Sequence, residues 1–212
     1  MTNDVRAART RDALIRSAAV LFDQCGYAEA SLSRISAGAG VSPGALHFHF
    51  TNKAAIARAV EARAARLLHR TARVTLREAT DPLRALTDSS LAFARLMNRD
   101  VVVRAGFQLS CENAHGNLRD LRRQWWGYVQ YLLNRAAERG MLAEAAVPER
   151  TAATVVAATV GLEILSRSNR EWLSSTSLSG IWQVLLPCVA APHILAMTVP
   201  AVRDRVPSTP AP

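Results

Sequence analysis

The amino-acid sequence predicts an all-α protein. Apolar residues recur at spacings of three and four along most of the chain, as they do on the buried face of a helix. The alternation that marks a half-buried strand is nearly absent, and residues that begin or end helices recur at regular intervals. With 212 residues, 50% of them hydrophobic, the chain is long enough for one or two domains with a full core.

Cap residues divide the N-terminal part of the chain into four predicted helices. Ser and Asn accept hydrogen bonds from the free N–H groups of a first turn, and Gly often ends a helix. The caps are Gly26 at a helix end and Ser31, Ser42 and Asn52 at helix starts. They predict helices over about residues 7–25, 31–39, from 42 onward, and 53–79.

The rest of the chain is predicted to form a helical bundle. Helical patterns cover about residues 83–97, 100–113, 118–139, 149–168 and 181–202, with a break at 114–117 and a polar loop at 174–180. We therefore divide the chain into an N-terminal three-helix domain at residues 1–53, a bundle at 54–205 and a disordered tail at 206–212.

The charge of the chain favours a polyanionic partner such as DNA. The net charge is +9, although a basic surface can also serve solubility alone, and arginine richness can follow from genome composition. A more local feature is that residues 30–60 contain no Asp or Glu. This segment would therefore repel no phosphate.

The second and third predicted helices have the spacing of a helix-turn-helix. Residues 39–41, Ala-Gly-Val, separate them, and Gly40 permits a tight turn. The apolar residues that can pack both helices on the first are Ile35, Val41, Leu46 and Phe50. The third helix would present residues 42–47 to a DNA major groove, and small residues at 43–45 would let its backbone come close. Two ordinary packed helices are the alternative.

The segment GVSPGALHFHFTNK, residues 40–53, resembles the DNA-binding domain of the TetR family of transcriptional regulators. The resemblance extends over about residues 9–60. It implies that DNA is contacted by Ser33, Ser42, Pro43, Gly44 and His47, and a phosphate by Lys53. His47 stands where the family usually carries Tyr, and Pro43 where close relatives often carry a basic residue, which predicts weaker contacts there and pH sensitivity at His47.

Residues that could carry catalysis or hold a metal are sparse. Residues 38–44 are rich in glycine but follow a helix and lack the spacing of a dinucleotide-binding loop. His47 and His49 diverge on a helix, and the three cysteines are too far apart for a zinc site or a disulfide framework. Glu163 is the one candidate general base, and a paired or solvated role is more ordinary. We expect no catalytic residue, no metal and no cofactor, and a chain that is not an enzyme.

Residues 181–202 carry no charged side chain, but three prolines there would break a membrane-spanning helix. A buried, kinked helix that pairs with residues 149–168 in a homodimer is the better interpretation. The N-terminus lacks the apolar region of a signal peptide. We expect a cytoplasmic protein with no membrane partner.

Trp125 lies on an apolar stripe of the helix predicted at 118–139. Such a tryptophan usually belongs to the core, and the wall of a ligand pocket is the alternative. Residues 100–109, DVVVRAGFQL, resemble a segment of the γ-butyrolactone autoregulator receptors, a TetR subfamily of streptomycetes and relatives. In those receptors a tryptophan at the position of Trp125 covers the ligand. The resemblance implies an effector site at Trp125. We expect the helix that holds Phe107 to form the pocket with it, and Gln108 is the nearest candidate for a polar donor.

These patterns predict a ligand-responsive transcriptional repressor. A helix-turn-helix domain joins a helical bundle for ligand binding and dimerisation, and the homodimer binds double-stranded operator DNA. A small γ-butyrolactone-like molecule would release it, with secondary metabolism under its control. The nearest alternative, which the strong basicity favours, is a related regulator that senses an antibiotic or a biosynthetic intermediate. Two other classes are a helical enzyme that uses Glu163 or a histidine, and a peripheral membrane protein that uses residues 181–202.

Overall fold

The computed structural model describes residues 2–112 and 120–198, and within them it contains helices and no strand. The elements are α1 (Thr2–Glu29), α2 (Leu32–Gly38), α3 (Pro43–His49), α4 (Lys53–Glu78), α5 (Pro82–Arg99), α6 (Val101–Glu112), α7 (Leu121–Glu138), α8 (Pro148–Ser166), the 3-10 helix η1 (Arg170–Leu173), α9 (Ser175–Val189) and α10 (Pro192–Thr198). The predicted all-α fold is confirmed.

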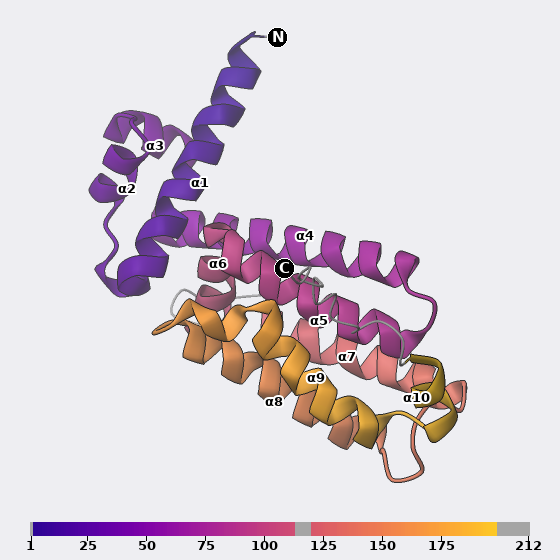
Figure 1. Ribbon diagram of the computed structural model, residues 1–212. Helices are drawn as coiled ribbons and strands as arrows, with labels where there is room; N and C mark the ends of the chain where they lie inside the picture. The colour runs from indigo at the N-terminus through magenta and orange to yellow at the C-terminus, as the bar shows by residue number, and fades with distance from the viewer. Residues whose placement is uncertain (1, 113–119, 199–212) are drawn as a thin grey trace, which may run out of the picture.

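The first three helices form a unit at one end of the molecule, where α1 packs against α4 and α6 (Figure 1). The predicted N-caps are confirmed, because Ser31 Oγ accepts a hydrogen bond from Arg34 N at 3.3 Å and Ser42 Oγ accepts one from Ala45 N at 3.2 Å. Gly26, with φ +75°, lies at the end predicted for the first helix. Its backbone is not helical and divides α1 into a long segment before it and a short segment that ends at Glu29.

The long helix α4 joins this unit to the body and runs along one side of it (Figure 1). Its first turns pack into the N-terminal core through Ile56 and Val60, and α6 enters the same core through Val102 and Leu109. One core therefore continues past residue 53, and a domain boundary at that point stays a prediction.

Gly106 brings α6 very close to α4. A Cβ at this position would overlap the Cβ of Ala64 and lie 3.2 Å from the carbonyl oxygen of Val60. Because α6 also packs against α1, it touches both the N-terminal unit and the helix that leads out of it.

The body beneath α4 is a bundle of α5, α7, α8 and α9 (Figure 1). Gly140, with φ +64°, ends α7 as predicted. Two main-chain hydrogen bonds then tie the following loop to the end of α9. Ala143 N donates to Val189 O at 2.9 Å, and Ala191 N donates to Met141 O at 2.8 Å.

The structure of the C-terminal part differs from two of the expectations. Residues 175–180 were expected in a polar loop, but Ser174 Oγ accepts a hydrogen bond from Ser177 N at 3.1 Å and starts α9 there. A single kinked helix was expected at 181–202. The described part of this range, residues 181–198, contains two helices instead, α9 with Pro187 in its last turn and α10, which begins at Pro192. The break expected at 114–117 and the tail at 206–212 lie outside the described residues.

Candidate functional site

The turn between α2 and α3 has the geometry of a helix-turn-helix. Gly40 adopts a φ of +67°, which glycine reaches without strain. The N–H groups of Gly40 and Val41 donate to the carbonyl oxygens of Ala37 and Ser36, each at 3.0 Å. The predicted role of Gly40 as the turn residue is confirmed.

The inner faces of α2 and α3 pack on α1. Ile35, Leu46 and Phe50 are almost fully buried in one cluster with residues of α1, and Val41 packs against it, as predicted. Ser17 Oγ on α1 also donates to Ile35 O at 2.8 Å. The orientation of α3 is therefore fixed by its buried side, which leaves the other side for contacts outside the chain.

The outer face of this motif carries the predicted DNA-contact residues. Five of them are exposed: Ser33 on α2, and Ser42, Pro43, Gly44 and His47 on or beside α3. A Cβ at Gly44 would have no neighbour closer than Ser42 Oγ at 3.9 Å, so neither the backbone nor packing requires glycine there. The structure brings the four residues of α3 together on one accessible surface.

Lys53 has partners other than the expected phosphate. Its ammonium donates to the carbonyl oxygens of Tyr27 at 2.8 Å, Ala28 at 2.9 Å and Ala30 at 2.9 Å, and lies 4.6 Å from the centre of the Tyr27 ring. An ammonium group has three donors, so all of them are in use. In this structure Lys53 holds the end of α1 to the start of α4.

Arg11 on α1 was not among the predicted residues. Its guanidinium lies 5.1 Å from the centre of the Phe50 ring, at the end of α3. Its side chain is exposed, which places a positive charge beside the outer face of the motif. Only the packing of α1 against α3 shows this neighbourhood.

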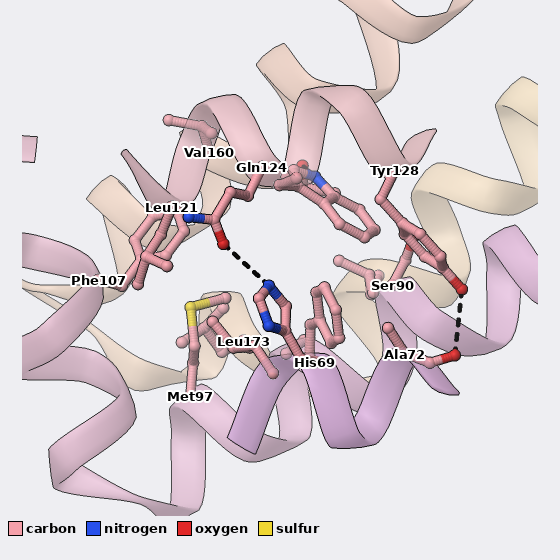
Figure 2. Close-up of a pocket in the computed structure, with 16 residues that line it drawn as sticks. His69, Ala72, Ser90, Met97, Phe107, Leu121, Gln124, Tyr128, Val160 and Leu173 are labelled. Atoms are coloured by element: carbon pink, nitrogen blue, oxygen red, sulfur yellow. Dashed lines mark hydrogen bonds between the residues drawn. The ribbon is translucent and has the colours of Figure 1, made fainter. Parts of the chain in front are cut away.

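A cavity of about 220 Å³ lies inside the body, between α4, α5, α7, α8 and α9 (Figure 2). An aromatic wall is formed by Phe93, Trp125 and Tyr128. The ring centres of Phe93 and Trp125 lie 4.8 Å apart, and those of Trp125 and Tyr128 lie 6.0 Å apart. Phe107 of α6 and Leu173 of η1 complete the lining. Among the residues that the structure describes, no Asp, Glu, Lys or Arg lines the cavity.

Two of the polar groups in the cavity wall form hydrogen bonds within the chain. Trp125 Nε1 donates to Thr159 Oγ1 at 2.8 Å, and the Tyr128 hydroxyl donates to Ala72 O at 3.3 Å.

At the edge of the cavity, His69 Nε2 and Gln124 Oε1 lie 2.9 Å apart and join α4 to α7 (Figure 2). His69 is exposed, so this pair lies where the cavity meets solvent.

The sequence of residues 14–60 matches the family model described as bacterial regulatory proteins, tetR family. The chain is also 30% identical over 205 residues to the A-factor receptor protein of Streptomyces griseus, covering 96% of this chain and 72% of that protein. The chain belongs to the TetR family. It is a regulatory protein with a helix-turn-helix domain, and the expectation that it is not an enzyme is confirmed by this membership.

Solved structures of TetR proteins share its fold. A γ-butyrolactone receptor described as ArpA-like has a TM-score of 0.79 and 29% identity, covering 92% of this chain and 94% of its own. CprB from Streptomyces coelicolor, solved with its biological operator sequence, has a TM-score of 0.77 and 29% identity over the same shares.

Two of the three effector residues predicted for this TetR protein lie in the cavity wall, and the third does not. Trp125 and Phe107 line the cavity, and Gln108 does not. Among the described residues of α6, Phe107 alone lines the cavity, and Gln108 points about 100° away from it around the helix. Gln124 supplies an amide instead. Gln124 lies three residues after Leu121 and four before Tyr128, on the face of α7 that lines the cavity, and this spacing was a signal that the predictions missed.

The other chemical candidates have structural roles. Glu163 is buried and paired with Arg167 at 3.1 Å, the ordinary role expected of it. Within residues 2–112 and 120–198, no cluster of His, Cys, Asp and Glu could hold a metal ion. None of the helices described is long and apolar enough to cross a membrane.

Proposed function

We propose that this chain is a ligand-responsive transcriptional repressor that binds operator DNA as a homodimer and is released by a small γ-butyrolactone-like molecule. One observation carries the proposal. The cavity is lined by residues of α4 and α6, the two helices that also enter the core of the DNA-binding unit. A ligand that changes the cavity therefore acts on elements that hold the helix-turn-helix.

The outer face of α3 supports binding to the major groove. Ser42, Pro43, Gly44 and His47 are exposed on a segment that carries no acidic residue, and Ser33 lies on the preceding helix. Bare backbone at Gly44 allows close approach of DNA. Arg11 and the net charge of +9 would add attraction for phosphates. The protein would then act in the cytoplasm, where bacterial DNA lies.

The lining of the cavity supports a neutral, mostly apolar effector. Burial of a charge without a partner is costly, and the described residues that line the cavity include no Asp, Glu, Lys or Arg. Flat aromatic rings cover a small ring-shaped ligand over a large area. The His69–Gln124 pair offers donors and an acceptor to a carbonyl or hydroxyl group. A lactone with an alkyl or hydroxyalkyl chain has this chemistry.

Exposed apolar side chains on α8 and α9 support the homodimer. Ile164 on α8 is 50% exposed and Val184 on α9 is 70% exposed. Ala153, Ala157 and Gly161 follow one another at one-turn spacing on α8 and let another helix approach closely. Two such helices from each chain can pair into a four-helix bundle. The two recognition helices of a dimer would then meet DNA about 34–36 Å apart or at a multiple of that distance.

Release would follow from a population shift. DNA favours the dimer conformation in which both α3 helices fit adjacent grooves, and the effector favours a conformation with another spacing. The effector can weaken DNA binding by no more than its difference in affinity for the two states.

A second candidate is a regulator that senses an antibiotic or a biosynthetic intermediate. The wall formed by Phe93, Trp125 and Tyr128 favours it, because three neighbouring rings fit a flat polycyclic compound as well as a lactone.

The deciding experiment is a gel shift with DNA from upstream of the protein's own gene. Synthetic γ-butyrolactones and aromatic antibiotics are then titrated into the complex in separate series. Release by lactones at micromolar concentration supports the first candidate, and release by the antibiotics alone supports the second. Retention of DNA against both series contradicts the proposed effector class. Transcripts of a deletion strain test the further proposal that the targets belong to secondary metabolism.

A further inference from the structure

Phe48 is the most solvent-exposed of the large hydrophobic side chains that the structure describes. Its side chain is 82% exposed, and the next most exposed is Val184 at 70%. Phe48 lies on α3, the recognition helix, and α3 buries Leu46 and is followed by buried Phe50. The core side of the helix is therefore already filled, and Phe48 has no place in it.

The position of Phe48 on α3 places it beside the proposed DNA contacts. It follows Gly44 by four residues, so the two share one face of the helix. Gly44 has no side chain to hold DNA away, and the fold does not require glycine there. Nothing within the chain therefore accounts for glycine at this position, whereas a close approach of DNA from outside would.

The ring of Phe48 is also oriented by a neighbour. The rings of Phe48 and His49 meet edge to face, with centres 5.2 Å apart and planes at 84°. His49 is partly buried, which limits its own movement. Contact between the two rings favours this orientation of Phe48, and a side chain that already favours its bound orientation loses less conformational entropy when it binds.

We propose that Phe48 reads the operator by contact with the methyl group of a thymine in the major groove. Among the four bases only thymine presents a methyl group there, and apolar side chains recognise it by contact. The phenyl ring has no hydrogen-bonding atom, so it selects thymine through this methyl group and disfavours a polar base edge. This inference rests on the proposed function and adds to it a residue that determines specificity.

The test is a thymine-to-deoxyuridine scan. Operator DNA is first selected from a random library by the unmutated full-length protein, and each thymine of the selected site is then replaced by deoxyuridine, which lacks the methyl group. We expect one thymine in each half-site at which the replacement weakens binding about fourfold, the factor that corresponds to burial of one methyl group. Phe48→Ala should bind the unmodified operator more weakly and be indifferent to that replacement.

Two controls separate a specific role from a general loss of folding. Phe48→Leu keeps an apolar side chain and should recover part of the sensitivity to the methyl group. Tyr131→Ala, at another exposed aromatic residue in the body, should leave the scan unchanged. If Phe48→Ala keeps the full sensitivity at every thymine, or if no thymine responds, the inference is wrong while the proposed DNA binding stands. If the unmutated protein selects no DNA, the proposed function fails and this inference fails with it.

Discussion

At the scale of single residues, Lys53 and Trp125 each have two candidate roles that a sequence motif does not separate. Lys53 belongs to the motif that resembles a DNA-binding segment, yet its ammonium is surrounded by carbonyl oxygens of its own chain. Trp125 lines the cavity and is also 7% exposed, in the core cluster of the body. Variants at either residue need a readout that separates folding from binding.

For Lys53, Lys53→Met should lower the melting temperature of the protein. Methionine removes the donor of three charge-assisted hydrogen bonds to carbonyl oxygens at the end of α1. A hydrogen bond to a charged group contributes about 1.5–3 kcal/mol to the free energy of unfolding. The salt dependence of DNA binding should stay as in the unmutated protein. A salt slope reduced by about one, with an unchanged melting temperature, would instead show that Lys53 neutralises a phosphate.

For Trp125, the informative change is Trp125→Phe. An alanine would cost about 3–5 kcal/mol because the residue belongs to the core, and folding and binding would be lost together. Phenylalanine keeps a ring but loses the hydrogen bond to Thr159 and part of the covering area. The effector concentration needed to release DNA should rise about threefold to tenfold, with DNA affinity unchanged.

Trp126→Phe is the matched control for this experiment. Trp126 follows on the same helix but hydrogen-bonds to Gln130 at 3.2 Å and does not line the cavity. Its variant should release DNA at the effector concentration of the unmutated protein. Equal behaviour of the two variants would show that Trp125 acts only in packing.

At the scale of elements, α6 is the short helix through which the cavity and the DNA-binding unit meet. Phe107 lines the cavity, Gly106 touches α4, and Arg104 contacts Asp23 on α1 through two nitrogens, each at 3.0 Å. Arg104 also donates to Met97 O at 2.8 Å. Movement of Phe107 by a ligand would therefore be transmitted along one rigid turn to Arg104 and α1.

Asp23→Asn should weaken this connection. Both partners are largely buried, with side chains 15% and 18% exposed, so loss of the charge should cost about 1.5–3 kcal/mol of unfolding free energy. The ratio of DNA affinities without and with effector should fall, because the position of α1 would depend less on α6. Gel shifts over an effector titration measure this ratio.

Asp88→Asn provides the comparison for an ordinary ion pair. Asp88 pairs with Arg84 on the surface of α5 at 2.8 Å, with the arginine side chain 53% exposed. Exposed pairs contribute little, so the affinity ratio should not change. If Asp23→Asn also leaves the ratio unchanged, the contact between α1 and α6 does not carry the coupling.

At the scale of the whole molecule, the body leaves apolar area in water along α8 and α9 that a second copy would cover. The cavity and these helices lie in the same body, so an effector can change both the dimer and the position of the DNA-binding units. Repression by this chain then depends on the geometry of two copies, since one helix-turn-helix alone reads a single half-site.

Val184→Arg should convert the protein to a monomer. A charged side chain at the centre of an apolar interface would be buried without a partner, which strongly disfavours association. Light scattering at micromolar concentration measures the change, and operator affinity should fall with it. Val74→Arg on α4, at a residue 44% exposed, is the control and should remain a dimer. A monomeric unmutated protein would contradict the proposed assembly.

The sequence by itself determined the features that arise from contacts between near neighbours in the chain. Ser31, Ser42 and Asn52 each accept a hydrogen bond from a backbone N–H three residues later, and Gly40 and Gly140 take conformations that other residues avoid. The all-α class followed because helix periodicity is also local. The position of Trp125 at the cavity was reached through its stripe together with a family resemblance.

Only the tertiary structure decided which distant groups meet. Gln124 rather than Gln108 joins His69 at the cavity, across 55 positions of sequence, and Arg104 finds Asp23 across 81. The three carbonyl partners of Lys53 likewise lie on α1 or just beyond it. A motif states which side chain is present but not which carbonyl or carboxylate lies next to it. That choice depends on the angles at which helices pack, and those angles are set by the whole core.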